Sequence, residues 1–274
     1  MKTRVISGVI GFCILVAVLL AGKLVLSIAV SIICFIALYE FYKSISKAGY
    51  KPVKLPGYLS AFILAFLGFD HSLTPTEFSG FLRIFVFISI VFLFSFIIFQ
   101  NKKHNIIDIS LSFFSIFYIT FLFSFIILTR NLTGGKYLVW FIFIGAWATD
   151  TFAYFSGRLF GKRKLIPSIS PKKTVEGSIG GVVGCMLITV LYGLYLSKIN
   201  IFDGLAIYQL APLGLLCGII SQVGDLAASS VKRYVNVKDY GNIMPGHGGA
   251  LDRFDSILFC APVVYFYINI LNLL

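Results

Sequence analysis

Long apolar runs separated by short polar connections set the pattern of this chain. Most runs contain about 20 residues, the length that an α-helix needs to cross a hydrocarbon core of roughly 30 Å. They are continuous rather than alternating, so they do not match the period-two pattern of a transmembrane β-barrel. The pattern predicts an all-α fold, a polytopic transmembrane helical bundle of about nine helices. The predicted spans lie near residues 4–21, 24–42, 57–70, 79–99, 107–129, 137–157, 177–197, 208–231 and 251–273, the third being short.

Composition supports a membrane protein, because 58% of the residues are hydrophobic and only 12% are charged. The first run follows Lys2 and Arg4 without a clear small-residue cleavage site, so we expect a retained helix. The cysteines all lie inside apolar runs without paired spacing, which argues against a disulfide framework or a zinc site. They are Cys13, Cys34, Cys185, Cys217 and Cys260.

The basic residues predict the orientation in the membrane. With a cytoplasmic N-terminus and nine crossings, all but five of the 23 Lys and Arg residues face the cytoplasm, and the C-terminus lies outside. The exceptions are Lys23, Arg83, Arg130, Lys136 and Lys198. The net charge of +12 is scattered through short connections, which favours attraction to phosphate or anionic lipid over nucleic acid. With no organelle-targeting segment evident, we expect a bacterial plasma membrane.

The two halves of the chain differ in kind. Residues 1–136 are expected to form N-terminal helices with a structural, lipid-facing or dimer-forming role, and residues 137–274 a C-terminal catalytic domain. In the second half, Asp150 and Asp225 lie inside apolar runs. An ionised carboxylate there costs several kcal/mol unless it is paired, hydrated or bound to a cation, so both are candidate functional residues. The alternative is a structural pair with a Lys or Arg of a neighbouring helix.

Asp252 and Asp255 begin the last span three residues apart, which places both carboxylates on one helix face. Hard oxygen ligands in this arrangement suit Mg²⁺, which commonly uses one or two protein carboxylates and leaves its other positions to water and phosphate oxygens. The alternative is a pair of acids that complement the helix dipole.

The connection before these acids is rich in glycine and basic residues. Glycine lets backbone N–H groups approach phosphate oxygens closely, and the helix start offers further donors. His247 is suited to donating to a phosphate or moving a proton, although a histidine that only satisfies backbone groups is a competing interpretation. The candidate phosphate-binding residues are Lys232, Arg233, Lys238, His247, Gly248, Gly249 and Arg253.

A second basic connection spans residues 157–177 and supplies Ser170, Lys172 and Lys173 as further candidates, unless it is only a positive-inside anchor. Pro171 predicts a turn entering the next helix, with Glu176 in the first helical turn. The following glycines, which predict close helix packing, are Gly177, Gly180, Gly181 and Gly184.

The run from Ser230 to Asp255 resembles the signature of the phosphatidate cytidylyltransferase family, also called CDP-diglyceride synthetases. Ser230 is followed by Lys-Arg, Lys-Asp, Pro-Gly-His-Gly-Gly, Asp-Arg and a further Asp. The segment 170–177, and Asp150 with Ala153, Tyr154 and Gly157, resemble family motifs in the same order. Residues 1–136 are similar to the family only as a series of hydrophobic helices.

The resemblance implies a Mg²⁺-dependent nucleotidyltransferase of phospholipid biosynthesis with its active site facing the cytoplasm. It would transfer CMP from CTP to phosphatidate, giving CDP-diacylglycerol and pyrophosphate. In the family, the carboxylates matching Asp225, Asp252 and Asp255 gather around the metal, and a monovalent cation such as K⁺ can accompany it. With Lys238 these are the expected catalytic residues, and Asp150 joins the substrate-binding set. The family also implies a homodimer.

Two other functions fit parts of the pattern. A CTP-dependent kinase of a polyprenol or phytol would need the same basic cytosolic site but would transfer the γ-phosphoryl group. A cation-coupled transporter would use Asp150 and Asp225 as an ion path, which leaves the glycine-rich loop beside two carboxylates unexplained.

Overall fold

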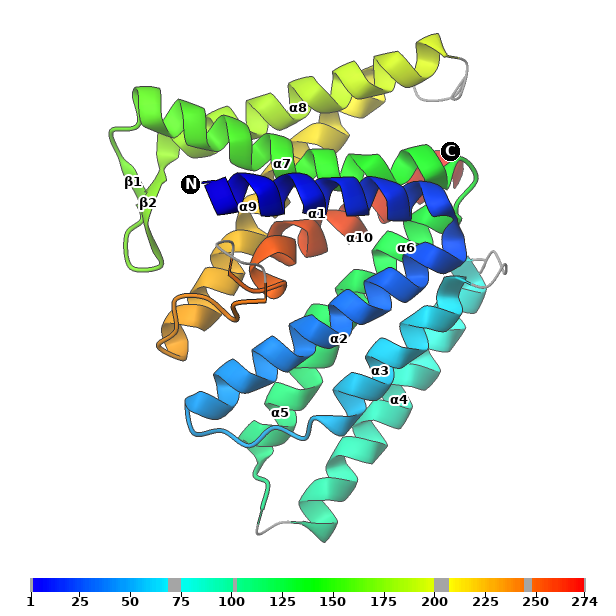
Figure 1. Ribbon diagram of the computed structural model, residues 1–274. Coiled ribbons are helices and arrows are strands. Elements are labelled where there is room, and N and C mark those ends of the chain that lie inside the picture. Colours follow the sequence, from blue (N-terminus) through cyan, green and yellow to red (C-terminus); the bar gives the residue numbers. More distant parts are fainter. Residues whose placement is uncertain (1, 69–74, 101–102, 200–206, 244–247, 274) are drawn as a thin grey trace. The chain divides into compact units, whose positions relative to one another are not determined.

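The computed structural model describes residues 2–68, 75–100, 103–199, 207–243 and 248–273 (Figure 1). Its helices and strands follow one another along the chain as α1 (Lys2–Ala21), α2 (Lys23–Lys47), α3 (Leu55–Leu64), η1 (Ala65–Gly68), α4 (Pro75–Phe99), α5 (Ile106–Ser115), η2 (Ile116–Phe121), α6 (Leu122–Asn131), α7 (Gly135–Phe160), β1 (Lys164–Ile166), β2 (Ser170–Thr174), α8 (Val175–Lys198), α9 (Ile207–Tyr234) and α10 (Leu251–Leu273).

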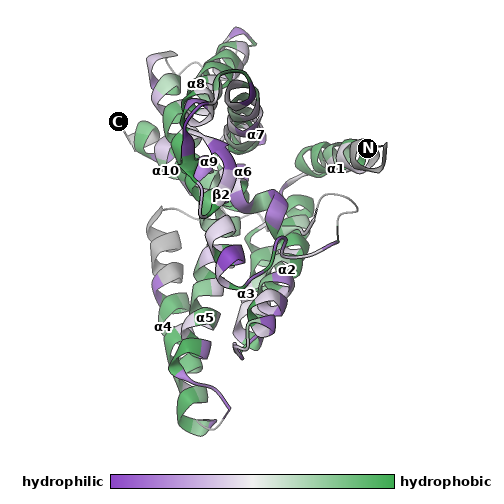
Figure 2. Cartoon of the chain, turned by 90° about the vertical axis from the view of Figure 1, so that its left-hand side faces the viewer, coloured by the Kyte–Doolittle hydropathy of each residue, from purple (hydrophilic) through white to green (hydrophobic). Residues whose placement is uncertain are grey.

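The all-α prediction is confirmed, and each predicted span coincides with a helix or a run of consecutive helices. In the described part of the chain, six helices are long and apolar enough to cross a membrane. Three further apolar helices are shorter there, including the third predicted span, Leu55–Gly68. Figure 2 shows mainly hydrophobic residues along the helices and hydrophilic ones toward their ends and in the connections. The chain is therefore a multi-pass membrane protein.

Two compact units make up the chain. The first contains Met1–Asn131 together with Val235–Asp252, and the second contains Leu132–Tyr234 together with Arg253–Leu274. The glycine-rich connection and Asp252 therefore belong to the same unit as the N-terminal helices, although they follow α9 in sequence. Each unit is described by itself.

Helix α2 lies at the centre of the first unit, where it packs against α3, η1 and α6. Its buried face carries Leu26, Val30, Ala37 and Phe41, whose helical spacing places them on one side. A neighbouring helix satisfies the hydroxyl of Tyr42 on the same helix, which lies 2.7 Å from Ser115 Oγ. This packing fixes the position of α2 within its unit.

Helices α7, α8 and α9 pack side by side in the second unit, and the glycines of α8 explain how closely. A Cβ at Gly177 would lie 2.8 Å from Ala153 O, and one at Gly181 would lie 2.9 Å from Thr149 O, both closer than real Cβ contacts. Only glycine permits this approach of α8 to α7, so the predicted packing role of these glycines is confirmed.

A short antiparallel hairpin, β1 paired with β2, joins α7 to α8 (Figure 1). The prediction of a turn at Pro171 is wrong, since Ser170–Thr174 forms strand β2. Proline is tolerated because each strand of a two-stranded sheet is an edge strand. Thr174 caps α8 by accepting from Gly177 N at 3.1 Å, and Glu176 lies in the first helical turn as predicted.

Candidate functional site

A pocket of about 370 Å³ in the second unit lies among α7, α8, α9 and the hairpin. Three of its side chains are basic and two are acidic, so its lining has a formal net charge of +1. It also has neutral polar and apolar side chains. The lining residues are Asp150, Ala153, Tyr154, Gly157, Arg158, Leu165, Lys172, Lys173, Thr174, Gly177, Ser178, Gln222 and Asp225.

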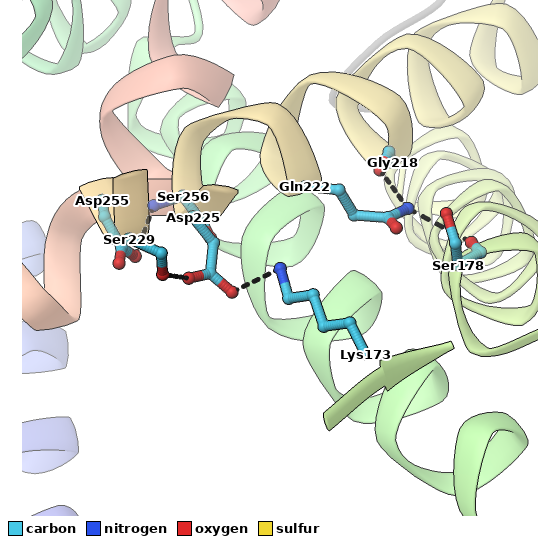
Figure 3. Close-up of polar contacts among 8 residues, drawn as sticks. All are labelled: Lys173, Ser178, Gly218, Gln222, Asp225, Ser229, Asp255 and Ser256. Carbon is cyan, nitrogen blue, oxygen red and sulfur yellow. Dashed lines mark hydrogen bonds and ion pairs between the residues drawn. The ribbon is translucent and has the colours of Figure 1, made fainter. Parts of the chain in front are cut away.

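An ion pair joins the hairpin to α9 across this pocket (Figure 3). Lys173 Nζ lies 2.5 Å from Asp225 Oδ2, and Ser229 Oγ donates to Asp225 Oδ1 at 3.3 Å. The two charged side chains are 26% and 28% exposed, so both remain accessible from the pocket. Asp225 is thus paired with a lysine. The alternative to a functional role was a pair with a Lys or Arg of a neighbouring helix, but Lys173 belongs to strand β2.

Gln222 lies three residues before Asp225 on α9 and fixes this helix against α8. Its Nε2 donates to Ser178 O at 3.1 Å and to Gly218 O at 2.9 Å (Figure 3). Since residues three apart lie on the same helix face, Gln222 and Asp225 both face the pocket. The Gln222 amide therefore fixes the part of α9 that carries Asp225.

Three carboxylates of the second unit repel one another electrostatically: Asp150 of α7, Asp225 of α9 and Asp255 of α10. Gly224 is one reason that two of them come close. A Cβ at Gly224 would lie 2.6 Å from Asp255 O, so only glycine allows the two backbones to approach at this level. Asp255 is 8% exposed, and its Oδ1 accepts from Ser256 N at 2.7 Å.

Basic side chains compensate this acidic group. Lys173 and Arg253 attract Asp150, and Lys232, which is 8% exposed, attracts Asp255. A buried lysine beside a buried carboxylate lowers the cost of removing both charges from water. Lys232 and Arg253 were predicted to bind phosphate, and the structure places each within electrostatic range of a carboxylate.

Two further contacts hold the hairpin that carries Lys172 and Lys173. Glu176 accepts from Lys162 N at 3.0 Å and from Arg163 N at 3.2 Å, which ties the end of α7 to the start of α8. Arg233 Nε donates to Ile169 O at 3.3 Å, which ties the hairpin next to Ser170 to the end of α9. The two lysines are thereby fixed at the pocket rather than carried on a free loop.

The glycine-rich segment of the first unit is organised around Asp252. Its Oδ2 accepts from Tyr240 N at 2.8 Å and from Gly249 N at 3.0 Å. Gly248 has a φ of +88°, a left-handed conformation that favours glycine.

The predicted site residues are divided between the two units. Asp150, Lys172, Lys173 and Asp225 line the same pocket. Ser170, Lys232, Arg233, Arg253 and Asp255 belong to the same unit, whereas Lys238, Gly248, Gly249 and Asp252 belong to the first. His247 lies outside the described residues.

The predicted metal ligands Asp225, Asp252 and Asp255 are likewise divided, with Asp252 alone in the first unit. Within the described residues, no group of three or more His, Cys, Asp or Glu side chains is arranged to hold a metal ion. The magnesium site stays a prediction. The donor chemistry suits it, because hard carboxylate oxygens that repel one another gain from a shared divalent cation.

Several residues of the pocket wall were not predicted from the sequence as members of the site, among them Arg158, Ser178 and Gln222. For Gln222 a signal existed. It is a polar residue inside an apolar run, three residues before Asp225, and this spacing places both on one helix face.

Comparison with known proteins gives a match over almost the whole chain. The sequence model of the cytidylyltransferase family matches residues 2–271. Relatives named phosphatidate cytidylyltransferase occur in Staphylococcus saprophyticus, 35% identical over 96% of this chain and 97% of the relative, and in Bacillus subtilis, 33% identical over 99% of each. One from Staphylococcus aureus is 35% identical over 96% of this chain and 97% of its own length. This chain belongs to the cytidylyltransferase family.

Proposed function

We propose that this chain transfers the cytidylyl group of CTP to phosphatidate, forming CDP-diacylglycerol and releasing pyrophosphate. The observation that carries the proposal is the similarity to phosphatidate cytidylyltransferases over at least 96% of the chain. The pocket of the second unit supports it, since it combines carboxylates with basic side chains on a membrane-embedded scaffold.

The charge of the pocket supports Mg²⁺ as the cofactor. Its lining of three basic and two acidic side chains gives a net charge of only +1, too little to neutralise a triphosphate. A divalent cation supplies the missing positive charge and polarises the phosphates when it is bound. Asp225, Asp252 and Asp255 would hold it, with K⁺ as a companion ion.

In the proposed reaction, a phosphate oxygen of phosphatidate attacks the α-phosphorus of CTP. A new P–O bond forms, the bond between the α- and β-phosphates breaks, and its electron pair leaves with pyrophosphate. Lys172, Lys173 and Arg158 line the pocket and would offset the charge that develops on the departing group. Asp225 would orient Lys173 through their ion pair. Positioning and charge are thus the main contributions of the protein.

The wall of the pocket also suits a lipid substrate. Ala153, Tyr154 and Leu165 add apolar surface beside the lysines, so a lipid phosphate can meet the basic groups while its acyl chains stay in hydrocarbon. The proposed orientation opens this site to the cytoplasm, where CTP is found, because the hairpin and its neighbours carry the basic residues that favour that side. A homodimer remains a prediction.

The position of the radiolabel tests the reaction. Purified protein is incubated with phosphatidate vesicles, Mg²⁺ and CTP labelled on either the α- or the γ-phosphate. We expect label in the lipid product only from the α-phosphate, with unlabelled phosphatidate required. Lipid labelled from the γ-phosphate would instead indicate a lipid kinase. Cation flux in proteoliposomes without CTP turnover would indicate a transporter.

A further inference from the structure

Glu40 is a carboxylate in the C-terminal third of the hydrophobic helix α2, and neither the pocket nor the proposed reaction gives it a role. It lies in α2, a candidate membrane span, and is 1% exposed. Burial of an ionised carboxylate in such a place is costly unless hydrogen bonds or charges compensate it. The contacts of Glu40 indicate what offsets this cost.

The carboxylate of Glu40 binds the start of α10. Its Oε2 accepts from Leu251 N at 3.0 Å, a bond between residues 211 positions apart in the chain. Leu251 is the first residue of α10, so its N–H has no partner within the helix. A carboxylate here satisfies that donor and interacts favourably with the positive end of the helix dipole.

Two glycines of the connection between α9 and α10 lie close against the Glu40 side chain. A Cβ at Gly249 would lie 2.5 Å from Glu40 Oε2, and one at Gly241 would overlap Oε1. Oε1 itself has no hydrogen-bond partner among the described residues. A larger residue at either glycine would therefore displace the Glu40 carboxylate from this position.

Other residues of α2 hold the same segment. The Phe41 ring centroid lies 6.4 Å from that of Tyr240, and Ser44 Oγ lies 3.4 Å from Tyr240 O. Tyr240 N in turn donates to Asp252 Oδ2 at 2.8 Å. Glu40 and Asp252 therefore hold one segment of backbone: Asp252 binds it at Tyr240 and Gly249, and Glu40 binds it at Leu251.

We infer that Glu40 is a positioning residue for the active site: from α2 it holds the start of α10, and with it residues 240–243 and 248–251, so that Asp252 keeps its orientation. This inference rests on the proposed function, which gives Asp252 its role at the metal. It also assigns the N-terminal helices a part in catalysis that is more specific than filling the membrane.

Three variants test the inference: Glu40→Gln, which keeps an acceptor but removes the charge, Glu40→Ala, which removes both, and Ser27→Ala as a control. Ser27 is also buried on α2, and its hydroxyl donates to Leu24 O at 2.9 Å and to Ala65 O at 3.0 Å, both within the N-terminal helices. The first measurement is amide hydrogen exchange of peptides covering residues 235–252, without substrate or metal.

We expect Glu40→Ala to speed exchange at the start of α10 roughly ten- to a hundredfold, as for a lost charge-assisted hydrogen bond, with a smaller effect for Glu40→Gln and none for Ser27→Ala. The second measurement is cytidylyl transfer against Mg²⁺ concentration. The Glu40 variants should show lower kcat and a higher half-saturating Mg²⁺ concentration, with the KM for phosphatidate unchanged.

The inference would be overturned if both Glu40 variants exchanged the amides of residues 235–252 at the wild-type rate. It would also be overturned if both kept the wild-type half-saturating Mg²⁺ concentration. A loss of thermal stability without either change would also overturn it, since that would mark a purely structural residue. If the wild-type protein makes no labelled liponucleotide, the proposed function fails instead, and the exchange measurement still decides whether Glu40 holds the segment. Should Glu40→Ala fail to fold, Glu40→Gln carries both measurements.

Discussion

Substitution of Gly224 by alanine should move Asp225 and Asp255 apart without changing either side chain. The added Cβ would lie 2.6 Å from Asp255 O, whereas ordinary van der Waals contact begins at 3.4 Å. Helices α9 and α10 must therefore move apart by about 0.8 Å at this level, and Asp225 moves with α9. Overpacking of this kind costs about 1–3 kcal/mol, and the better helix propensity of alanine offsets up to about 1 kcal/mol.

Gly224→Ala should lower the rate of the reaction as well as the stability of the fold. A displacement of about 1 Å at reacting groups can reduce a rate about a hundredfold, so we expect a loss of roughly ten- to a hundredfold in liponucleotide formation. The assay is cytidylyl transfer from α-labelled CTP to phosphatidate in detergent micelles. Thermal unfolding of the same preparation measures stability.

Gly214→Ala is the matched control. Gly214 lies on the same helix, and a Cβ there would lie 2.6 Å from Met186 Cα, the same degree of overlap but with α8 and away from the carboxylates. We expect both variants to lose similar stability, but only Gly224→Ala to lose most of its activity. Equal activities in the two variants would refute the reasoning that the approach of α9 to α10 sets the site geometry.

The remaining predictions concern charge and topology. Lys173→Met should lower kcat/KM for CTP about ten- to a hundredfold, as expected for a lost charge-assisted hydrogen bond, whereas Lys173→Arg should retain most activity. A kcat/KM within twofold of wild type for Lys173→Met would exclude a role for the ion pair with Asp225. Orientation is tested with single cysteines in a variant without the native cysteines. Ser168→Cys should react with a membrane-impermeant maleimide only after cells are opened, and Thr133→Cys should react in intact cells. The reverse labelling would invert the proposed orientation.

The helices could be predicted from the sequence because their signal is local. A span of about 20 apolar residues specifies a membrane helix whatever its neighbours are, since backbone groups in lipid must be satisfied within the helix. The glycine face of α8 was predictable for the same reason, because its spacing alone places the glycines together. The hairpin was not predictable, since its short polar strands lack an alternating pattern and contain Pro171.

The contacts of the carboxylates could not be read from the sequence. Asp150 and Asp225 were singled out because they lie in apolar runs, but the pairing of Asp225 with Lys173 depends on how the hairpin folds back onto α9. Glu40 gave the same local signal and was missed. Asp108 explains why the signal is ambiguous: it is 3% exposed near the start of another run, yet its oxygens accept from Lys51 N and Asn105 N, a helix-capping role.

Asp225→Asn, assayed across a range of Mg²⁺ concentrations, tests the central claim most directly. The wild-type protein should label phosphatidate from α-labelled CTP only when Mg²⁺ is present. The variant keeps the size of the side chain, so it should insert and fold normally, but it should be about a hundredfold or more slower at every Mg²⁺ concentration. Turnover by Asp225→Asn close to that of the wild type, or full wild-type turnover without a divalent cation, would contradict the account.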